Sequence, residues 1–434
     1  LISLINRWIT PVALTGIVFY VFLVPLTLNL HLEFMTDGER DLFNATELMR
    51  TGDLTIPGAY LGQSGSWVGA NIDQGPLYSF LLAPALAISS SPTAVVATHA
   101  IVTALGLLAF FVFARRYVRD AGAIMAVVLM AASGHTLTAL ENIWHPAMVP
   151  GFALIQLALL DRLIHKPSAR NLTGLLVVTS LLCQVYLAAA STVPAVLVAL
   201  GWVLLKNKVP RKHVLWAVAI GTIVSLPFLL RFFFADHESV TDAEPVEVVW
   251  AWKRLTMAIG RLLDPGWTAL WGWLPVAWIV CAGVLLGLLD LVRKRGITLT
   301  VWLALLVGVL FLAGRAYSLQ ETQRYLLLVP AVLMGLAIRG MGALLPEEPS
   351  EERPWIRTLC GVLALGVLWV PPVLGGWNMA ALSPTPHYPS ERIGADTRLG
   401  LGEQETIAEW LKDQQQWAWD DWVQCTHGSF LTLD

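Results

Sequence analysis

The chain has 434 residues, of which 56% are hydrophobic and 14% are charged, and its formal net charge is -3. Soluble domains carry about a quarter charged residues, so this composition excludes an ordinary soluble protein. The mean hydropathy of +0.64 indicates an integral membrane protein. The small net charge gives no electrostatic reason to expect a nucleic-acid partner.

Apolar runs that can cross about 30 Å of hydrocarbon as helices recur along the chain. We expect an all-α polytopic membrane protein with about eleven transmembrane helices. The runs lie near residues 9–30, 94–114, 120–135, 146–164, 171–187, 189–205, 213–231, 269–292, 297–314, 323–340 and 355–377. The first run is long and no small-residue cleavage pattern follows it, so we expect it to remain as an anchor.

Clusters of basic residues separate these runs and predict the orientation of the chain. They are Arg115, Arg116 and Arg119; Arg162, Lys166 and Arg170; Lys206, Lys208, Arg211 and Lys212; and Arg293, Lys294 and Arg295. The positive-inside rule places them, with the N-terminus, in the cytoplasm. Loops 32–92, 135–145, 232–268 and 315–322 and the C-terminus are then extracytoplasmic. The short apolar piece 76–90 is interpreted as a helix that lies at or re-enters the outer interface. The alternative is two short spans, with an error in the predicted topology.

The first outer loop contains the charged stretch TDGERDLFNATELMRTGDLTIPG, residues 36–58. It predicts an amphipathic helix that begins at Thr36 or Asp37 and stops at Thr51 and Gly52. The expected apolar face consists of Leu42, Phe43, Leu48 and Met49. Such a helix would lie on the outer membrane surface.

The acidic residues Asp37, Glu39 and Asp41 lie where this helix begins. Carboxylates at that position could accept a proton from a sugar acceptor or hold a divalent cation. Glu47 and Arg50 need no such role, because their spacing of three predicts a simple ion pair on the helix surface.

The pattern Asp-x-x-Arg-Asp, then Gly-Asp-Leu, then Gly-Pro-Leu-Tyr before an apolar LLAP piece resembles the GT-C membrane glycosyltransferases. The branch is that of protein O-mannosyltransferases, aminoarabinose transferases and related polyprenyl-phosphate-sugar-dependent enzymes. The matching residues are Asp37, Glu39, Arg40, Asp41, Gly52, Asp53, Leu54, Gly75, Pro76, Leu77, Tyr78, Leu81, Leu82, Ala83 and Pro84. Trp144-His145-Pro146 and Gln323-Arg324-Tyr325-Leu326 with Pro330 fit the same pattern. Outside residues 37–84 the resemblance is diffuse.

This resemblance implies a GT-C-like transmembrane domain over residues 1–377 and a small extracytoplasmic segment over residues 378–434. The implied activity is the inverting transfer of a sugar from a polyprenyl-phosphate carrier to a protein, lipid or glycan acceptor. The implied location is the extracytoplasmic face of a bacterial inner membrane. The predicted catalytic residues are Asp37 and Glu39, and the predicted substrate-binding residues are Arg40, Asp41, Tyr78, His145, Arg315, Arg324 and Tyr325.

Arginines of the outer loops are expected to stabilise the negative charge that develops on the phosphate leaving group. A guanidinium group suits phosphate because its N–H donors form a fork. Arg324 is favoured because it belongs to the Arg-Tyr-Leu motif, and Arg315 and Arg261 are the next candidates.

One departure from the family pattern keeps a second interpretation open. Many relatives have adjacent Asp-Glu residues, whereas this chain has Asp37-Gly38-Glu39. Either Glu39 serves as the second acid or Asp37 acts alone. The alternative is a catalytically degenerate GT-C-like subunit with a structural role beside a membrane-protein partner. A transporter is disfavoured, because the chain shows no pair of broken helices in matching halves.

Overall fold

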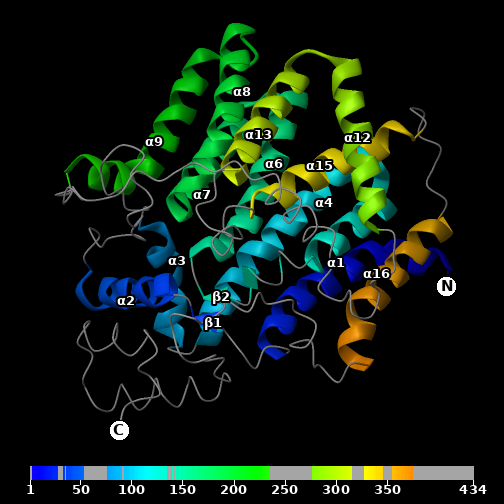
Figure 1. Cartoon of the computed structure of the whole chain (residues 1–434), viewed down its shortest axis with the longest axis horizontal. Helices are drawn as coiled ribbons and strands as arrows, with labels where there is room; N and C mark the ends of the chain where they lie inside the picture. Colours follow the sequence, from blue (N-terminus) through cyan, green and yellow to red (C-terminus); the bar gives the residue numbers. More distant parts are fainter. Residues whose placement is uncertain are drawn as a thin grey trace.

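A computed structural model describes residues 2–27, 33–34, 36–52, 76–89, 92–133, 136, 139–140, 142–143, 145–234, 276–314, 327–345 and 354–374. Within these ranges the regular structure is almost entirely helical (Figure 1). The α-helices are α1 (Ile2–Thr27), α2 (Thr36–Thr51), α3 (Leu77–Ile88), α4 (Pro92–Ala131), α6 (Val149–His165), α7 (Ala169–Val185), α8 (Val193–Leu205), α9 (Arg211–Phe234), α12 (Val276–Lys294), α13 (Ile297–Gly314), α15 (Val329–Ala343) and α16 (Pro354–Leu374).

Two very short strands add an element that the sequence analysis did not predict. Strand β1 (Glu33–Phe34) pairs in parallel with β2 (Asn142–Ile143). Each strand is followed closely by a helical segment, β1 by α2 and β2 by the 3-10 helix η2 (His145–Met148). A second 3-10 helix, η3 (Leu187–Thr192), leads into α8. The strand pair therefore fixes the start of α2 beside the start of α6.

The length of the apolar helices and the exposure of their side chains indicate that the chain is a membrane protein. Four segments are long and apolar enough to span a bilayer, namely Ala94–Ala131, His145–His165, Leu187–Leu205 and Arg211–Leu229, and the described part of the chain has shorter apolar helices besides. Large apolar side chains such as Leu215, Trp216 and Ile223 are more than half exposed, as expected for a surface that faces lipid. Every predicted span overlaps a described helix or one half of α4, but the number that cross the membrane remains a prediction.

Helix α4 contains a sharp break at the first basic cluster. Val118 and Arg119 have non-helical backbone angles, and Arg119 adopts a positive φ of 59° that is uncommon for a residue other than glycine. Arg115 forms an ion pair with Asp120 at 2.5 Å across this break. The two spans predicted near 94–114 and 120–135 therefore correspond to the two halves of α4, and the arginines lie at the turn between them.

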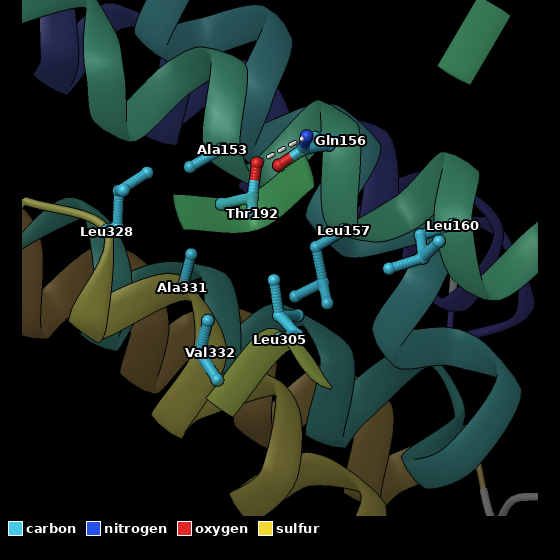
Figure 2. Close-up of a pocket in the computed structure, with 9 residues that line it drawn as sticks. All are labelled: Ala153, Gln156, Leu157, Leu160, Thr192, Leu305, Leu328, Ala331 and Val332. Atoms are coloured by element: carbon cyan, nitrogen blue, oxygen red, sulfur yellow. Dashed lines mark hydrogen bonds between the residues drawn. The ribbon is translucent and has the colours of Figure 1, made fainter. Parts of the chain in front are cut away.

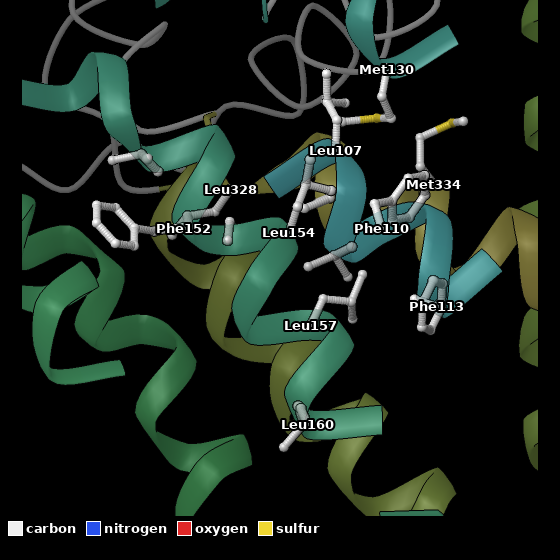
Figure 3. Packing of buried hydrophobic residues seen from close by; sticks show 14 of the residues in the cluster. Leu107, Phe110, Phe113, Met130, Phe152, Leu154, Leu157, Leu160, Leu328 and Met334 are labelled. Atoms are coloured by element: carbon white, nitrogen blue, oxygen red, sulfur yellow. The ribbon is translucent and has the colours of Figure 1, made fainter. Parts of the chain in front are cut away.

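Helices α4 and α6 cross at two glycines and form the centre of the bundle. A Cβ atom on Gly106 would lie 2.5 Å from the carbonyl oxygen of Gly151, so only glycine permits this approach of the two backbones. Figure 3 shows the large side chains that fill the space around the crossing, from α4, α6 and α15. They include Leu107, Phe110 and Phe113 of α4 and Leu154, Leu157 and Leu160 of α6.

A network of charged and polar side chains joins four helices at the end of α6 that is remote from His145. We call it the Arg339 cluster, and its members are Arg116, Tyr117, Asp161, His165, Asp290, Lys294 and Arg339. Its centre is the ion pair between Arg339 Nε of α15 and Asp290 Oδ2 of α12 at 2.8 Å, in which both side chains are at most 6% exposed. Charges inside a membrane bundle are stable when they face one another in this way.

Candidate functional site

Helix α2 places the motif residues at one end of the bundle. Its start at Thr36 and its stop agree with the prediction. Gly52 has a positive φ of 67°, and its N–H donates to the carbonyl oxygen of Leu48 at 2.9 Å, which ends the helix. Asp37, Glu39 and Arg40 lie in the first turns of α2, although the structure describes only their backbone.

The predicted surface pair on α2 is confirmed. Arg50 Nη2 lies 2.8 Å from Glu47 Oε2, and the Arg50 side chain is 71% exposed. An exposed pair of this kind contributes little to stability. These two residues therefore need no functional role.

The face of α2 that packs against the rest of the described chain differs in part from the predicted apolar face. Met49 is 40% exposed, whereas Asp41, Asn44 and Ala45 are buried with at most 5% exposure. The buried stripe includes polar residues because one of them, Asp41, has a partner in a distant part of the chain. Hydrophobicity alone could not reveal that partner.

Asp41 and His145 form a buried pair between α2 and η2. Asp41 Oδ2 lies 2.9 Å from Nδ1 of the His145 ring and 3.3 Å from the His145 backbone nitrogen. Both side chains are at most 3% exposed. Because a carboxylate only accepts hydrogen bonds, Nδ1 carries a proton and donates it to Asp41. The pair fixes the orientation of the imidazole ring at the start of α6.

Tyr78 of α3 and His99 of α4 form a second buried pair beside the first. The Tyr78 hydroxyl lies 2.8 Å from His99 Nε2. Burial, and then the negative charge of Asp41, raise the pKa of Tyr78 well above its usual value, so the phenol keeps its proton. The ring of Tyr78 lies 5.8 Å from that of His99 and 6.2 Å from that of His145, measured between centroids.

Tyr186, which precedes η3, lies at the same place. Its ring centroid is 6.1 Å from that of His145, and Tyr186 is 3% exposed. Five segments thus meet in one polar and aromatic cluster, which we call the outer cluster. It consists of Asp41, Tyr78, His99, His145 and Tyr186.

The structure brings together some of the predicted site residues and leaves others untested. Asp41, Tyr78 and His145 come from separate segments and meet in the outer cluster. Arg315, Arg324 and Tyr325 lie outside the described residues. His99 and Tyr186 were not predicted from the sequence, although a histidine inside an apolar helix is a signal of function or of a buried partner.

The described residues offer no multidentate metal site. Among them, no group of three or more His, Cys, Asp or Glu side chains is arranged to hold a metal ion. The side chains of Asp37 and Glu39 lie outside this description, so the divalent cation remains a prediction.

A small cavity in the middle of the bundle is distinct from the outer cluster. Figure 2 shows it between α6, η3, α13 and α15, with Gln156 as a polar side chain in its wall. The Gln156 amide donates to the hydroxyls of Thr179 and Thr192 at 3.0 and 2.9 Å. The cavity measures about 10 Å³, which is close to the space of one water molecule. It is therefore too small for a sugar or a lipid chain.

Comparison with known proteins gives the fold. No family model matches the sequence, and no curated protein matches it. Among solved structures, ArnT from Cupriavidus metallidurans bound to undecaprenyl phosphate aligns over 83% of this chain and 65% of its own, with 16% identity and a TM-score of 0.51. This chain has the fold of ArnT.

Two further solved structures also align with this chain. ArnT in the apo state aligns over 83% of this chain and 64% of its own, with 15% identity and a TM-score of 0.50. The arabinosyltransferase EmbB from Mycobacterium smegmatis aligns over 93% of this chain and 43% of its own, with 15% identity and a TM-score of 0.47. The predicted resemblance to GT-C membrane glycosyltransferases is confirmed at the level of the fold by the ArnT match. This chain spans about 65% of the length of ArnT.

Proposed function

We propose that this chain transfers a sugar from a polyprenyl-phosphate carrier to an acceptor at the extracytoplasmic face of a bacterial inner membrane. The proposal is carried by the convergence of Asp41, Tyr78 and His145 in the outer cluster of an ArnT-like fold. It is supported by the carrier that the compared ArnT structure holds, undecaprenyl phosphate.

In the proposed reaction, an acceptor hydroxyl or amine attacks the anomeric carbon of the sugar. The bond from that carbon to the phosphate oxygen breaks, and the lipid phosphate leaves with the bonding electron pair. The proton of the acceptor passes to a carboxylate of the first outer loop. We assign this role to Asp37, with Glu39 as the second acid. Asp41 lies one helical turn after Asp37 and, through His145, fixes the helix that carries both acids.

The phosphate needs positive charge in the transition state, because it becomes more negative as the bond to the sugar breaks. We assign this role to Arg40, Arg315 and Arg324, with Tyr325 as a further hydrogen-bond donor. A divalent cation held by the loop carboxylates would supply the same kind of stabilisation. Treatment with a chelator distinguishes stabilisation by arginines from stabilisation by a cation. If the cation is needed, sugar transfer stops in the chelator and returns when Mg²⁺ or Mn²⁺ is added.

The distribution of charge supports the orientation of the chain in the membrane. The Arg339 cluster gathers Arg116, Lys294 and Arg339 at the end of the bundle remote from the outer cluster. Basic residues favour the cytoplasmic side. We therefore propose a cytoplasmic N-terminus and an extracytoplasmic segment 378–434.

A donor screen tests the proposed function. Membranes that contain the full chain are incubated with a panel of polyprenyl-phosphate sugars, and release of free polyprenyl phosphate is measured. We expect one donor or a small group to be consumed above the level in membranes without the chain. If no donor in the panel is consumed, the proposal fails, and the structural role beside a membrane-protein partner becomes the better explanation.

A further inference from the structure

Two buried imidazole nitrogens of the outer cluster have no hydrogen-bond partner among the described residues. They are Nε2 of His145 and Nδ1 of His99. The two residues are 2% and 0% exposed. Leaving a buried donor or acceptor unpaired costs free energy, so each nitrogen indicates a polar partner that the described residues do not provide.

The hydrogen bonds of the other ring nitrogens define what these two can accept or donate. We assign the Tyr78 phenol as the donor to His99 Nε2, because this direction gives the phenol proton an acceptor at 2.8 Å. His99 must then carry its own proton on Nδ1, which is a donor without a partner. His145 Nδ1 donates to Asp41, which leaves Nε2 as the ring nitrogen without a partner.

The surroundings of the two nitrogens favour a sugar over a phosphate. The outer cluster contains one fixed negative charge, that of Asp41, and no lysine or arginine. An anion would therefore be repelled. A hydroxyl group can donate and accept hydrogen bonds, so it can pair with either nitrogen. The aromatic rings of Tyr78 and Tyr186 lie beside the imidazoles, and they add apolar surface of the kind that the C–H groups of a sugar contact.

We propose that His99 and His145 bind hydroxyl groups of the transferred sugar and that Tyr78 and Tyr186 form the wall of this subsite. The inference rests on the proposed function, since it concerns the sugar that the carrier delivers. It assigns recognition of the sugar to the outer cluster and recognition of the phosphate to the arginines of the loops. The two parts of the donor are then bound by separate groups of residues.

Two conservative substitutions separate binding from folding. In His145→Asn, the side-chain amide can replace the Nδ1–H donor to Asp41, whereas Nε2 is lost. In His99→Gln, the amide oxygen can replace Nε2 as the acceptor for Tyr78, whereas Nδ1 is lost. The matched control is His213→Asn, because His213 is an exposed histidine at the start of α9.

The test measures binding of polyprenyl phosphate with and without a sugar to the purified full chain in nanodiscs, by quenching of tryptophan fluorescence. For the wild type and His213→Asn, we expect one sugar of the panel to tighten binding relative to the bare carrier. In His145→Asn and His99→Gln, this gain should fall about tenfold, while affinity for the bare carrier changes less than about twofold.

Each outcome decides between the two proposals. If the bare carrier and every loaded carrier fail to bind the wild type, the proposed function fails and the subsite with it. If carriers bind but no sugar tightens binding, or if the gain survives in both variants, the subsite is overturned while the proposed function stands.

Discussion

Replacing Asp37 with asparagine is expected to lower the rate of sugar transfer by about 10²–10⁴-fold, the usual contribution of a general base. The amide has nearly the same shape as the carboxylate but cannot take the proton of the acceptor. The matched control is Glu47→Gln on the same helix, whose side chain forms the surface pair with Arg50. That variant should transfer sugar at about the wild-type rate. The measurement is release of polyprenyl phosphate from the donor identified in the screen.

The same assay shows which acid acts despite the interruption at Gly38. If Asp37→Asn keeps its activity and Glu39→Gln loses it, Glu39 is the base and the assignment of Asp37 is wrong. If both variants are inactive but bind the donor normally, the two acids act together. Equal loss in Asp37→Asn and Glu47→Gln would mean that the substitutions disturb the helix rather than the chemistry.

Replacing Arg339 with methionine is expected to destabilise the protein by about 3–5 kcal/mol, because it leaves the buried carboxylate of Asp290 without its main partner. Arg339 and Asp290 are 3% and 6% exposed in their side chains. The Lys294 side chain contacts the same carboxylate at 3.0 Å but is 59% exposed. Lys294→Met should therefore cost at most about 1 kcal/mol. Unfolding of the purified chain in detergent measures both changes.

A double substitution tests the reason for the loss. Arg339→Met combined with Asp290→Leu removes both charges, so most of the lost stability should return, because buried pairs can often be replaced by apolar residues at small cost. The structure indicates that the Arg339–Asp290 pair is shielded from water. Equal shifts of the unfolding midpoint in Arg339→Met and Lys294→Met would contradict this. Neither variant changes the outer cluster, so donor binding by the folded fraction should be retained.

The helices were predictable because their local signals are strong. The predicted span 297–314 coincides with α13, Ile297–Gly314, which begins directly after Gly296 in a left-handed conformation with φ of 79°. The stop of α2 at Gly52 was equally readable. In both helices, the residues that form the helix and the glycine at one end of it are neighbours in the sequence. Such a helix can therefore be predicted without knowledge of any distant contact.

The outer cluster was only partly predictable, since its contacts depend on residues far apart in the chain. Asp41 and His145 are separated by 104 positions, and no local pattern predicts that α2 turns its Asp41 side inward and exposes Met49. The family resemblance nominated Asp41, Tyr78 and His145 one by one. Their association, and the presence of His99, required the fold.

The Arg339 cluster was missed for a related reason. In the sequence, Arg339 lies near the end of an apolar run, where an arginine commonly reaches the headgroups. The structure instead buries it against Asp290 of α12, 49 positions away. A hydropathy profile contains no information on which face of a helix meets which neighbour.

The location of the carrier's phosphate shows at which end of the bundle sugar transfer occurs. We would determine the structure of the full chain in nanodiscs with undecaprenyl phosphate by electron cryo-microscopy. We expect phosphate density at the α2–α3 end of the bundle, beside the outer cluster and the first turns of α2. Phosphate density at the opposite end, beside Arg116 and the Arg339 cluster, would contradict it.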